Sequence, residues 1–318
     1  MTATGRVTSI GRVTEVAGGA LPRVGLIGLG TMGGLIARAL VAAGHAVVGH
    51  DPVAACRARF RRSGGRPLMS SAEVARQSDI LITSLPGSAA LQAVVAELQS
   101  AAPPCARQIL VETSTLPLAD KQAAAKALRR QGRAMVDAPI SGTATPTPQQ
   151  TWIMYLSGTQ ADCRAASAVA RAFTRDAPRV GALGMGTKLK FAANHLVAIY
   201  NLAYAEMVTL CRRMGLDPAV ALAHLGHSPY LGTGAMRLRV PMMIEARYEP
   251  ATMKMVLWQK DMQVIGAMAR AVRCPTPLFD ACAPVYAEAM GMDLGEADTA
   301  AVAEVLARRA RGRGPAGG

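Results

Sequence analysis

The chain has 318 residues with a formal net charge of +14, and its 51% hydrophobic content is enough for one large core or two ordinary domains. No run approaches the ~20 consecutive apolar residues that a membrane-spanning helix needs, so we expect no membrane partner. The arginine clusters are dispersed over predicted helix ends and tails without interleaved aromatic residues, so we expect a small anionic substrate rather than nucleic acid as the partner.

The two ends of the chain differ from the rest. The first twenty residues lack the continuous apolar core of a signal peptide, so residues 1–21 are predicted to form a flexible extension. Residues 311–318, rich in glycine and arginine, are predicted to be a disordered tail. The six cysteines form no C-x-x-C pair and no framework spacing, which favours a reducing, cytoplasmic location over secretion.

Strands and helices alternate through the first half. Residues 23–30 (RVGLIGLG) form a continuous apolar run that ends in glycine, which is typical of a strand buried on both faces. A helix at 31–43 and a strand at 45–50 follow. The alternation continues with helices at 53–62, 71–76, 88–99, 117–131 and 161–173, a short element near Pro67, and strands at 79–85, 108–112, 134–137, 151–157 and 179–181. This order predicts an α/β fold with a doubly wound parallel sheet of the Rossmann type over residues 22–184.

After Gly186 the strand signals stop. We predict helices at 187–214, 218–226 (with Asp217 as N-cap), 233–245, 252–272, 276–291 and 297–309, which make an all-helical substrate and oligomerisation domain over residues 185–310. The first of these is a long helix between the two domains. Thr187 is its predicted N-cap, and Gly215 is expected just past its last turn.

Three polar residues share one face of this long helix. At about 100° per residue, Lys190, Asn194 and Asn201 return to nearly the same angle, whereas Lys188 points to the far side. Apolar residues crowd the remaining surface, so the helix should be mostly buried and its polar residues need partners. The alternative is a wet edge on which the lysine extends its ammonium group to solvent.

The sequence GLGTMG at residues 28–33 matches the pattern G-x-G-x-x-G. It follows a predicted buried strand and opens a helix, which is the context of a dinucleotide-binding loop. Gly28 permits a tight turn, Gly30 lets the backbone approach a pyrophosphate, and Gly33 lets helix and strand pack closely. The free N–H groups of the helix N-terminus then bind the diphosphate. The predicted cofactor-binding residues here are Gly28, Gly30, Thr31, Met32 and Gly33.

Asp51 stands at the end of the second predicted strand. A carboxylate at this place can accept hydrogen bonds from both ribose hydroxyls of NAD and repels the 2′-phosphate of NADP. The alternative role is to cap the helix after Pro52, and both roles can hold at once. We predict NAD as the cofactor, with NADP possible because several arginines, starting with Arg57, stand close by.

Doubly wound sheets bind their ligands at the carboxyl ends of the strands. Here these ends carry Leu85-Pro86-Gly87, the segment ETSTLP at residues 112–117, and the segment DAPISGT at residues 137–143. In the second segment a hydroxyl of Thr113, Ser114 or Thr115 can donate to a cofactor or cap the next helix. In the third, a Ser-Gly turn offers a hydroxyl and backbone N–H groups that suit a substrate carboxylate.

Other polar residues give weaker signals. His195, adjacent to Asn194, points about 100° away from the Lys190 face and is interpreted as a packed helix histidine. His224 and His227 lie three residues apart without nearby acids, so we expect no metal site.

Together these motifs resemble the β-hydroxyacid dehydrogenases, a family that includes 3-hydroxyisobutyrate dehydrogenase and tartronate semialdehyde reductase, with 6-phosphogluconate dehydrogenase more distant. The resemblance covers residues 22–308 and rests on an ordered series: VGLIGLGTMG, SLPGS, ETSTLP, DAPISG, G-M-G-x-x-x-Lys190-x-x-x-Asn194, and Lys260-Asp261. It implies a Rossmann domain, an all-helical C-terminal domain, and a homodimer or homotetramer. The activity it implies is hydride transfer between NAD(P) and a small 3-hydroxyacid or semialdehyde-acid.

The same resemblance implies roles for individual residues. Lys190 is the catalytic general acid and base, and Asn194 helps to hold the substrate. The residues implied to bind substrate are Ser141, Gly142, Thr143 and Lys260, and those implied at the cofactor, besides the glycine loop and Asp51, are Leu85, Pro86, Thr115 and Lys260.

The chain departs from the family where Ser141-Gly142-Thr143 replaces the usual Ser-Gly-Gly and where the stretch after it is rich in proline and glutamine. These departures bear on substrate identity. Two alternatives stay open: an imine reductase on the same fold, against which Lys190 argues, and a non-catalytic dinucleotide-binding scaffold, against which Lys190, Asn194 and Lys260 argue together.

Overall fold

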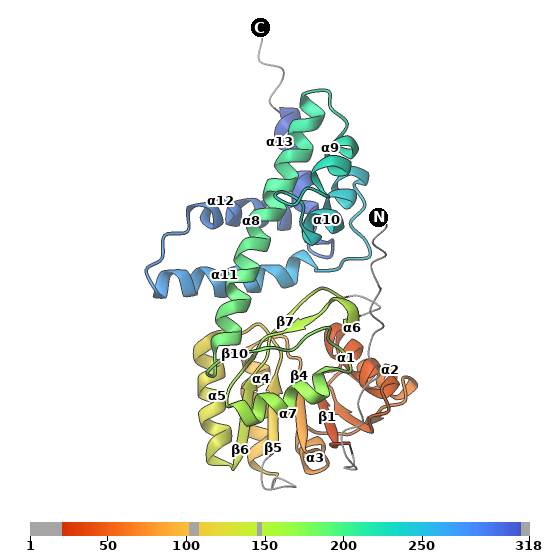
Figure 1. The fold of residues 1–318 in the computed structure, drawn as a ribbon, viewed down its shortest axis with the longest axis vertical. Helices are drawn as coiled ribbons and strands as arrows, with labels where there is room; N and C mark the ends of the chain where they lie inside the picture. The colour runs from red at the N-terminus through yellow and green to blue at the C-terminus, as the bar shows by residue number, and fades with distance from the viewer. Residues whose placement is uncertain (1–20, 102–107, 145–147, 313–318) are drawn as a thin grey trace, which may run out of the picture.

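The computed structural model describes residues 21–101, 108–144 and 148–312, so residues 1–20 of the predicted extension and 313–318 of the predicted tail lie outside the described residues. An α/β domain carries an all-helical domain above it, and the long helix α8 (Met185–Arg213) rises from the first into the second (Figure 1). The second half of the chain therefore has the all-helical architecture that its sequence predicts.

The α/β domain is built on an eight-stranded sheet with the order β10-β9-β6-β5-β4-β1-β2-β3. Its strands are β1 (Val24–Ile27), β2 (Val47–His50), β3 (Arg66–Pro67), β4 (Ile80–Thr83), β5 (Gln108–Glu112), β6 (Arg133–Asp137), β9 (Leu156–Ser157) and β10 (Arg179–Gly181). All neighbours are parallel except β6 and β9. The predicted doubly wound sheet is confirmed, with one antiparallel pair near its edge.

Helices cover both faces of the sheet, which is why its central strands are apolar on both sides. One face packs against α1 (Thr31–Ala42), α2 (Ala54–Arg62) and α7 (Gln160–Ala170) in a core that contains Ile36, Phe60 and Val169. The other packs against α3 (Ser71–Arg76), α4 (Ser88–Gln99) and α5 (Leu118–Arg130), whose core contains Val74, Leu91 and Leu128.

The prediction of one strand over 151–157 is wrong. The structure has a short helix α6 (Pro148–Thr151), then β8 (Ile153–Met154), which pairs with β7 (Ile140–Ser141) outside the main sheet, and only then β9. Trp152 explains the break, because this fully buried side chain donates its indole N–H to the Thr143 carbonyl at 2.7 Å. The chain thus turns toward the 141–143 loop before it joins the sheet.

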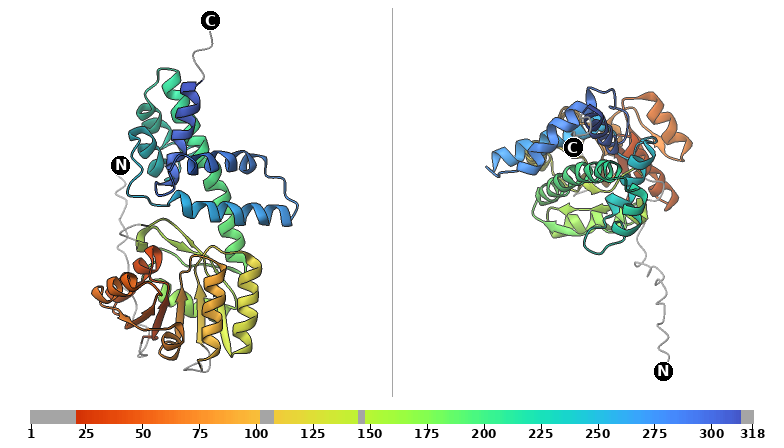
Figure 2. Two further views of the ribbon diagram at one scale, coloured as in Figure 1. Left: turned by 180° about the vertical axis from the view of Figure 1, so that it is seen from behind. Right: turned by 90° about the horizontal axis from the view of Figure 1, so that it is seen from above.

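The helical domain surrounds α8 with α9 (Pro218–Leu225), α10 (Gly234–Glu245), α11 (Met255–Ala271), α12 (Pro277–Met290) and α13 (Val302–Gly312), the last preceded by a 3₁₀ turn at Thr299–Ala301. Its core combines aliphatic, methionine and aromatic side chains, and Trp258 and Tyr286 are among the largest that are fully buried. The paired helices α11 and α12 project sideways from α8 (Figures 1 and 2). No helix of the described residues is long and apolar enough to cross a membrane.

The start of α8 differs from the prediction. The helix begins at Met185 after Gly184, whose φ of 95° is left-handed, and Thr187 therefore lies inside the first turn instead of capping it. The Thr187 N–H and hydroxyl both donate to Asp137, at 2.8 and 2.7 Å. The other end is as predicted: Gly215 follows the helix with φ 75°, and Asp217 caps α9 by accepting the Ala219 N–H.

Candidate functional site

The predicted polar face of α8 is buried. Lys190 and Asn194 are 7% and 4% exposed, whereas Lys188 on the opposite side is exposed. The wet-edge alternative is therefore wrong for Lys190. Asn201 is also buried, but it donates to the Thr299 hydroxyl inside the helical core at 3.2 Å and lies about 16 Å along the helix from Lys190.

Helix α11 supplies the partners of this face. The Asn194 amide donates from Nδ2 to Asp261 Oδ2 at 2.8 Å, and Asp261 is 4% exposed. Lys260 Nζ lies 3.5 Å from Asp261 Oδ1 and donates to the Thr115 carbonyl at 2.7 Å. The site thus joins three segments far apart in sequence: the N-terminal part of α8, the N-terminal half of α11 and the loop after β5.

Sequence reasoning gave Asp261 no role. The sequence did contain a sign of its importance: an acidic residue inside a largely apolar predicted helix needs a polar partner if it is buried. The partner itself comes from another helix, 67 residues earlier in the chain. No local pattern links the two positions.

The electrostatics of Lys190 suit proton transfer. Burial lowers the pKa of Lys190 below its usual value, the Asp261 carboxylate opposes this, and the Lys260 ammonium lowers the pKa further. Burial also raises the pKa of Asp261, while Lys260, Lys190 and the Asn194 amide oppose the rise. A lysine with a lowered pKa can lose and regain its proton at a less alkaline pH than a solvated lysine.

The glycine loop has the geometry of a diphosphate cradle. Gly28 has φ 91°, and a Cβ there would lie 2.1 Å from the Ser84 carbonyl oxygen; a Cβ at Gly33 would lie 1.9 Å from the Gly28 carbonyl oxygen. A Cβ at Gly30, in contrast, would meet no atom within 4 Å. Gly28 and Gly33 are required by the turn and the helix packing, while Gly30 faces open space at the start of α1. The loop therefore fits a bound diphosphate.

Thr31 and Met32 form the first turn of α1, next to this open space. A cavity of about 460 Å³ beside the loop is lined by Gly30 and Thr31 together with Arg38 and Arg59 of α1 and α2. A cavity of about 540 Å³ between α5, β6 and α7 contains none of the predicted site residues.

Asp51 has a further role that the sequence did not indicate. Its carboxylate accepts the Leu29 N–H at 2.7 Å and the Val53 N–H at 2.8 Å, and it is 7% exposed. The first bond fixes the glycine loop from the neighbouring strand. The alternative of a helix cap is wrong, because α2 begins at Ala54 with Val53 as its N-cap and no side-chain cap.

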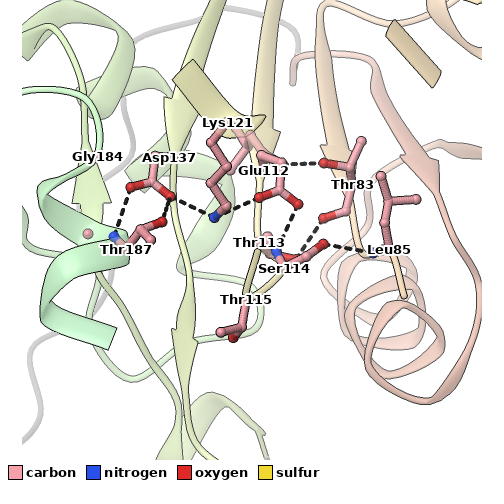
Figure 3. A network of polar contacts seen from close by, with 12 residues as sticks. Thr83, Leu85, Glu112, Thr113, Ser114, Thr115, Lys121, Asp137, Gly184 and Thr187 are labelled. Atoms are coloured by element: carbon pink, nitrogen blue, oxygen red, sulfur yellow. Dashed lines mark hydrogen bonds and ion pairs between the residues drawn. The ribbon is translucent and has the colours of Figure 1, made fainter. Parts of the chain in front are cut away.

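The hydroxyls after β5 do not cap α5, whose N-cap is Pro117 without a side-chain bond. The Thr113 hydroxyl donates to the Thr83 carbonyl at 2.7 Å, and the Ser114 hydroxyl accepts the Leu85 N–H at 2.8 Å (Figure 3). These bonds tie the loop that carries Thr115 to the loop that carries Leu85 and Pro86.

The 141–143 loop follows β7. Gly142 has φ 149°, and a Cβ there would lie 2.3 Å from the Trp152 ring. The Thr143 carbonyl is held by the Trp152 indole. The Ala144 N–H donates to the Thr252 carbonyl of the helical domain at 3.4 Å, so the segment links the two domains.

The remaining histidine candidates do not join the site. His195 lies outside it and stacks on Phe279, with ring centroids 5.2 Å apart. Among the described residues, no three His, Cys, Asp or Glu side chains come together as a metal site.

Two family models together match most of this chain. Residues 23–184 match the family model described as "NAD binding domain of 6-phosphogluconate dehydrogenase". Residues 184–306 match the family model described as "NAD-binding of NADP-dependent 3-hydroxyisobutyrate dehydrogenase". An L-threonate dehydrogenase of Cupriavidus necator is 30% identical over 89% of this chain and 95% of its own length. A mitochondrial 3-hydroxyisobutyrate dehydrogenase of Drosophila melanogaster is 27% identical over 93% of this chain and 92% of its own length.

Solved structures share the fold. A Mycobacterium tuberculosis 3-hydroxyisobutyrate dehydrogenase with L-serine has a TM-score of 0.81 at 23% identity, covering 90% of this chain and 99% of that one. An imine reductase from a Pseudomonas species scores only 0.60 at 20% identity, covering 90% and 99%. With both family models matched across the sheet and the helical domain, the chain is a member of the β-hydroxyacid dehydrogenase family of NAD(P)-dependent oxidoreductases.

Proposed function

We propose that Lys190 is the general acid and base of a dehydrogenase that interconverts a small 3-hydroxyacid and its semialdehyde-acid. One observation carries this assignment. Lys190 is buried beside Asn194, Asp261 and Lys260, and its pKa is lowered by burial and by the nearby ammonium group.

In the oxidation direction, neutral Lys190 accepts the proton of the substrate hydroxyl while a hydride leaves the same carbon. The nicotinamide cofactor supplies the hydride acceptor when bound. The C–H and O–H bonds break, a C=O bond forms, and the lysine ends as an ammonium group. In the reduction direction, the ammonium returns this proton to the carbonyl oxygen.

The substrate is proposed to be small and anionic. Ser141 and the N–H groups of Gly142 and Thr143 are the proposed partners of its carboxylate, and Asn194 positions its hydroxyl. Trp152 supports this assignment, since it closes the space next to Gly142 and holds the Thr143 carbonyl. The relatives named L-threonate and 3-hydroxyisobutyrate dehydrogenase make these two acids the first substrates to test.

For the cofactor we propose NAD in preference to NADP, held by the glycine loop, Leu85, Pro86 and Thr115. The support is the carboxylate of Asp51, which stands where a 2′-phosphate would be repelled. Arg57, the nearby arginine that could have favoured NADP, donates from Nη1 to the backbone carbonyls of Asp51 and Pro52, at 2.6 and 2.9 Å.

We also propose a cytoplasmic homodimer or homotetramer. The helical domain exposes large apolar side chains that a partner subunit would cover, including Leu196 (47% exposed), Leu210 (58%), Leu257 (54%) and Leu278 (64%). The scattered cysteines are free thiols where the structure describes them, which agrees with a reducing compartment.

A substrate panel tests the proposal. The purified protein is assayed with NAD and NADP in parallel on 3-hydroxyisobutyrate, L-threonate and L-serine, and with NADH on semialdehyde-acids and on a cyclic imine. Turnover of a hydroxyacid with NAD preferred is expected. Turnover of the imine alone would assign the chain to imine reduction, and tight NADH binding without any turnover would make it a scaffold.

A further inference from the structure

A fully buried group of three charges lies beneath the proposed site. Lys121 of α5 places its Nζ 2.7 Å from Glu112 Oε2 and 2.8 Å from Asp137 Oδ1, and all three residues are 0% exposed. Glu112 and Asp137 are the last residues of β5 and β6 and stand opposite each other in register. We call Lys121, Glu112 and Asp137 the buried triad (Figure 3).

Stability alone does not explain the triad. Burying an ammonium and two carboxylates costs free energy that a set of apolar side chains would not, so such a group is weak evidence for stability. Burial by itself lowers the pKa of Lys121, but the attraction of the two carboxylates outweighs this effect and raises the pKa above the usual value. Lys121 thus remains an ammonium that both strand ends bind.

On one side the triad holds the first turn of α8. Asp137 accepts the Thr187 N–H and hydroxyl, and its Oδ2 also accepts the Ser157 hydroxyl at 3.0 Å. The Ser157 oxygen in turn accepts the N–H groups of Gly184 and Gly186 at 3.2 and 3.0 Å. Gly184 offers no side chain to cap these N–H groups, so a strand end takes over the role. Lys190 lies three residues beyond Thr187, less than one turn away.

On the other side the triad holds the proposed cofactor loops. Glu112 Oε1 accepts the Ser114 N–H at 2.9 Å, and the Ser114 hydroxyl accepts the Leu85 N–H. The next residue, Thr115, receives Lys260 at its carbonyl. An unbroken series of bonds therefore runs from the start of α8, through Lys121 and Glu112, to Ser114, which precedes Thr115, and on to Leu85 (Figure 3).

We propose that Lys121 is a positioning residue: by bridging Glu112 and Asp137 it fixes the distance between the helix that carries Lys190 and the loops that hold the nicotinamide cofactor. This proposal rests on the proposed function for its kinetic readout. Proton and hydride must leave adjacent atoms of one substrate, so a displacement of about 1 Å between these elements lowers kcat by up to ~10²-fold.

The test variant is Lys121→Met, which keeps an unbranched side chain only one atom shorter and removes the charge. The matched control is Arg133→Met at the opposite end of the same two strands, where Arg133 is 3% exposed and donates to Gln108 at 2.7 Å. Both variants lose stability. We expect kcat to fall about 10²-fold in Lys121→Met, with a smaller change in substrate KM, and to stay within about twofold of wild type in Arg133→Met. An equal kcat loss in both variants, or wild-type kcat in Lys121→Met, would overturn the proposal.

A second pair of variants separates positioning from folding. Lys121→Met/Glu112→Gln returns the formal charge of the buried triad to the wild-type value of −1, so it should regain stability while kcat stays low. Recovery of kcat together with stability would contradict the proposal. Thr187→Val is isosteric and cuts only the hydroxyl bond to Asp137; it should fold normally, with a measurable kcat loss, and an unchanged kcat would count against the role of Asp137.

One readout does not depend on turnover. Hydrogen–deuterium exchange of peptides that cover 185–190 and 84–86 should be faster in Lys121→Met than in Arg133→Met, because only the former loses the bridge. If wild-type protein turns over no substrate of the panel, the proposed function fails, and this comparison still decides the positioning role. Equal exchange in the two variants would refute it.

Discussion

Asn194 Nδ2 donates to Asp261 Oδ2 at 2.8 Å, and both side chains are at least nine-tenths buried. This bond joins α8 to α11 one turn after Lys190. It orients the Asn194 amide that we propose to position the substrate hydroxyl, and it places a carboxylate within the electrostatic reach of Lys190. The neighbour of Asp261, Lys260, acts on Lys190 in the opposite sense.

The opposite effects of Asp261 and Lys260 on the pKa of Lys190 predict opposite shifts in the pH dependence of hydroxyacid oxidation. Oxidation needs neutral Lys190, so its rate rises with pH through the lowered pKa of this lysine. In Asp261→Asn the loss of negative charge lowers that pKa further, and the rising limb of kcat/KM moves to lower pH. In Lys260→Met the loss of the ammonium raises the pKa, and the limb moves to higher pH. Profiles of hydroxyacid oxidation from pH 6 to 10.5 measure both; shifts in the same direction would contradict this electrostatic account.

The glycine loop predicts a contrast between two alanine substitutions. Gly30→Ala meets no atom within 4 Å, so the melting temperature should be unchanged while NADH binding weakens by about tenfold or more, since the new methyl group occupies the diphosphate cradle. Gly33→Ala puts a Cβ 1.9 Å from the Gly28 carbonyl oxygen and should cost about 1–3 kcal/mol of folding free energy. Thermal melts and fluorescence titration with NADH measure the two effects, and normal NADH affinity in Gly30→Ala would place the diphosphate elsewhere.

The buried lysine should reduce stability at neutral pH. With its folded-state pKa below the unfolded value, Lys190 takes up a proton on unfolding, so stability rises with pH between the lowered pKa and about 10.5. Lys190→Met removes this dependence. The difference by which the melting temperature of the variant exceeds that of wild type should be largest at pH values below the lowered pKa of Lys190, and it should shrink toward pH 10.5. A difference that grows with pH would show that the folded-state pKa of Lys190 is not lowered.

Asp51→Asn tests the cofactor preference. The variant keeps the shape of the side chain but loses the charge proposed to repel a 2′-phosphate, so the ratio of kcat/KM for NAD to that for NADP should fall about tenfold. A small loss in melting temperature is also expected, because one of the Leu29 and Val53 N–H groups loses its acceptor. A wild-type enzyme that clearly prefers NADP would refute the assignment before the variant is made.

The parts of the fold and site that depend on local sequence could be predicted. The glycine loop is one example: the positive φ of Gly28 and the contact between Gly33 and the Gly28 carbonyl oxygen both arise within a single strand–turn–helix unit. The aligned face of Lys190 and Asn194 is another, because helical geometry fixes it over four residues.

The parts of the fold and site that depend on contacts between distant segments could not be predicted. Thr187 looked like an N-cap because threonine often fills that position, but the N-terminus of α8 is held by Asp137, 50 residues earlier. The run 151–157 has a strand-like composition, yet Trp152 turns it toward Thr143. Asp261 needed α8 beside α11 before it could be recognised as a member of the site.

The most direct test of the account is the turnover of Lys190→Ala with saturating cofactor on a hydroxyacid that the wild-type enzyme oxidises. We expect kcat to fall about 10²–10⁴-fold, the usual share of general acid–base catalysis, while NADH affinity remains at its wild-type value. Near-normal turnover in this variant would contradict the assignment of proton transfer to Lys190.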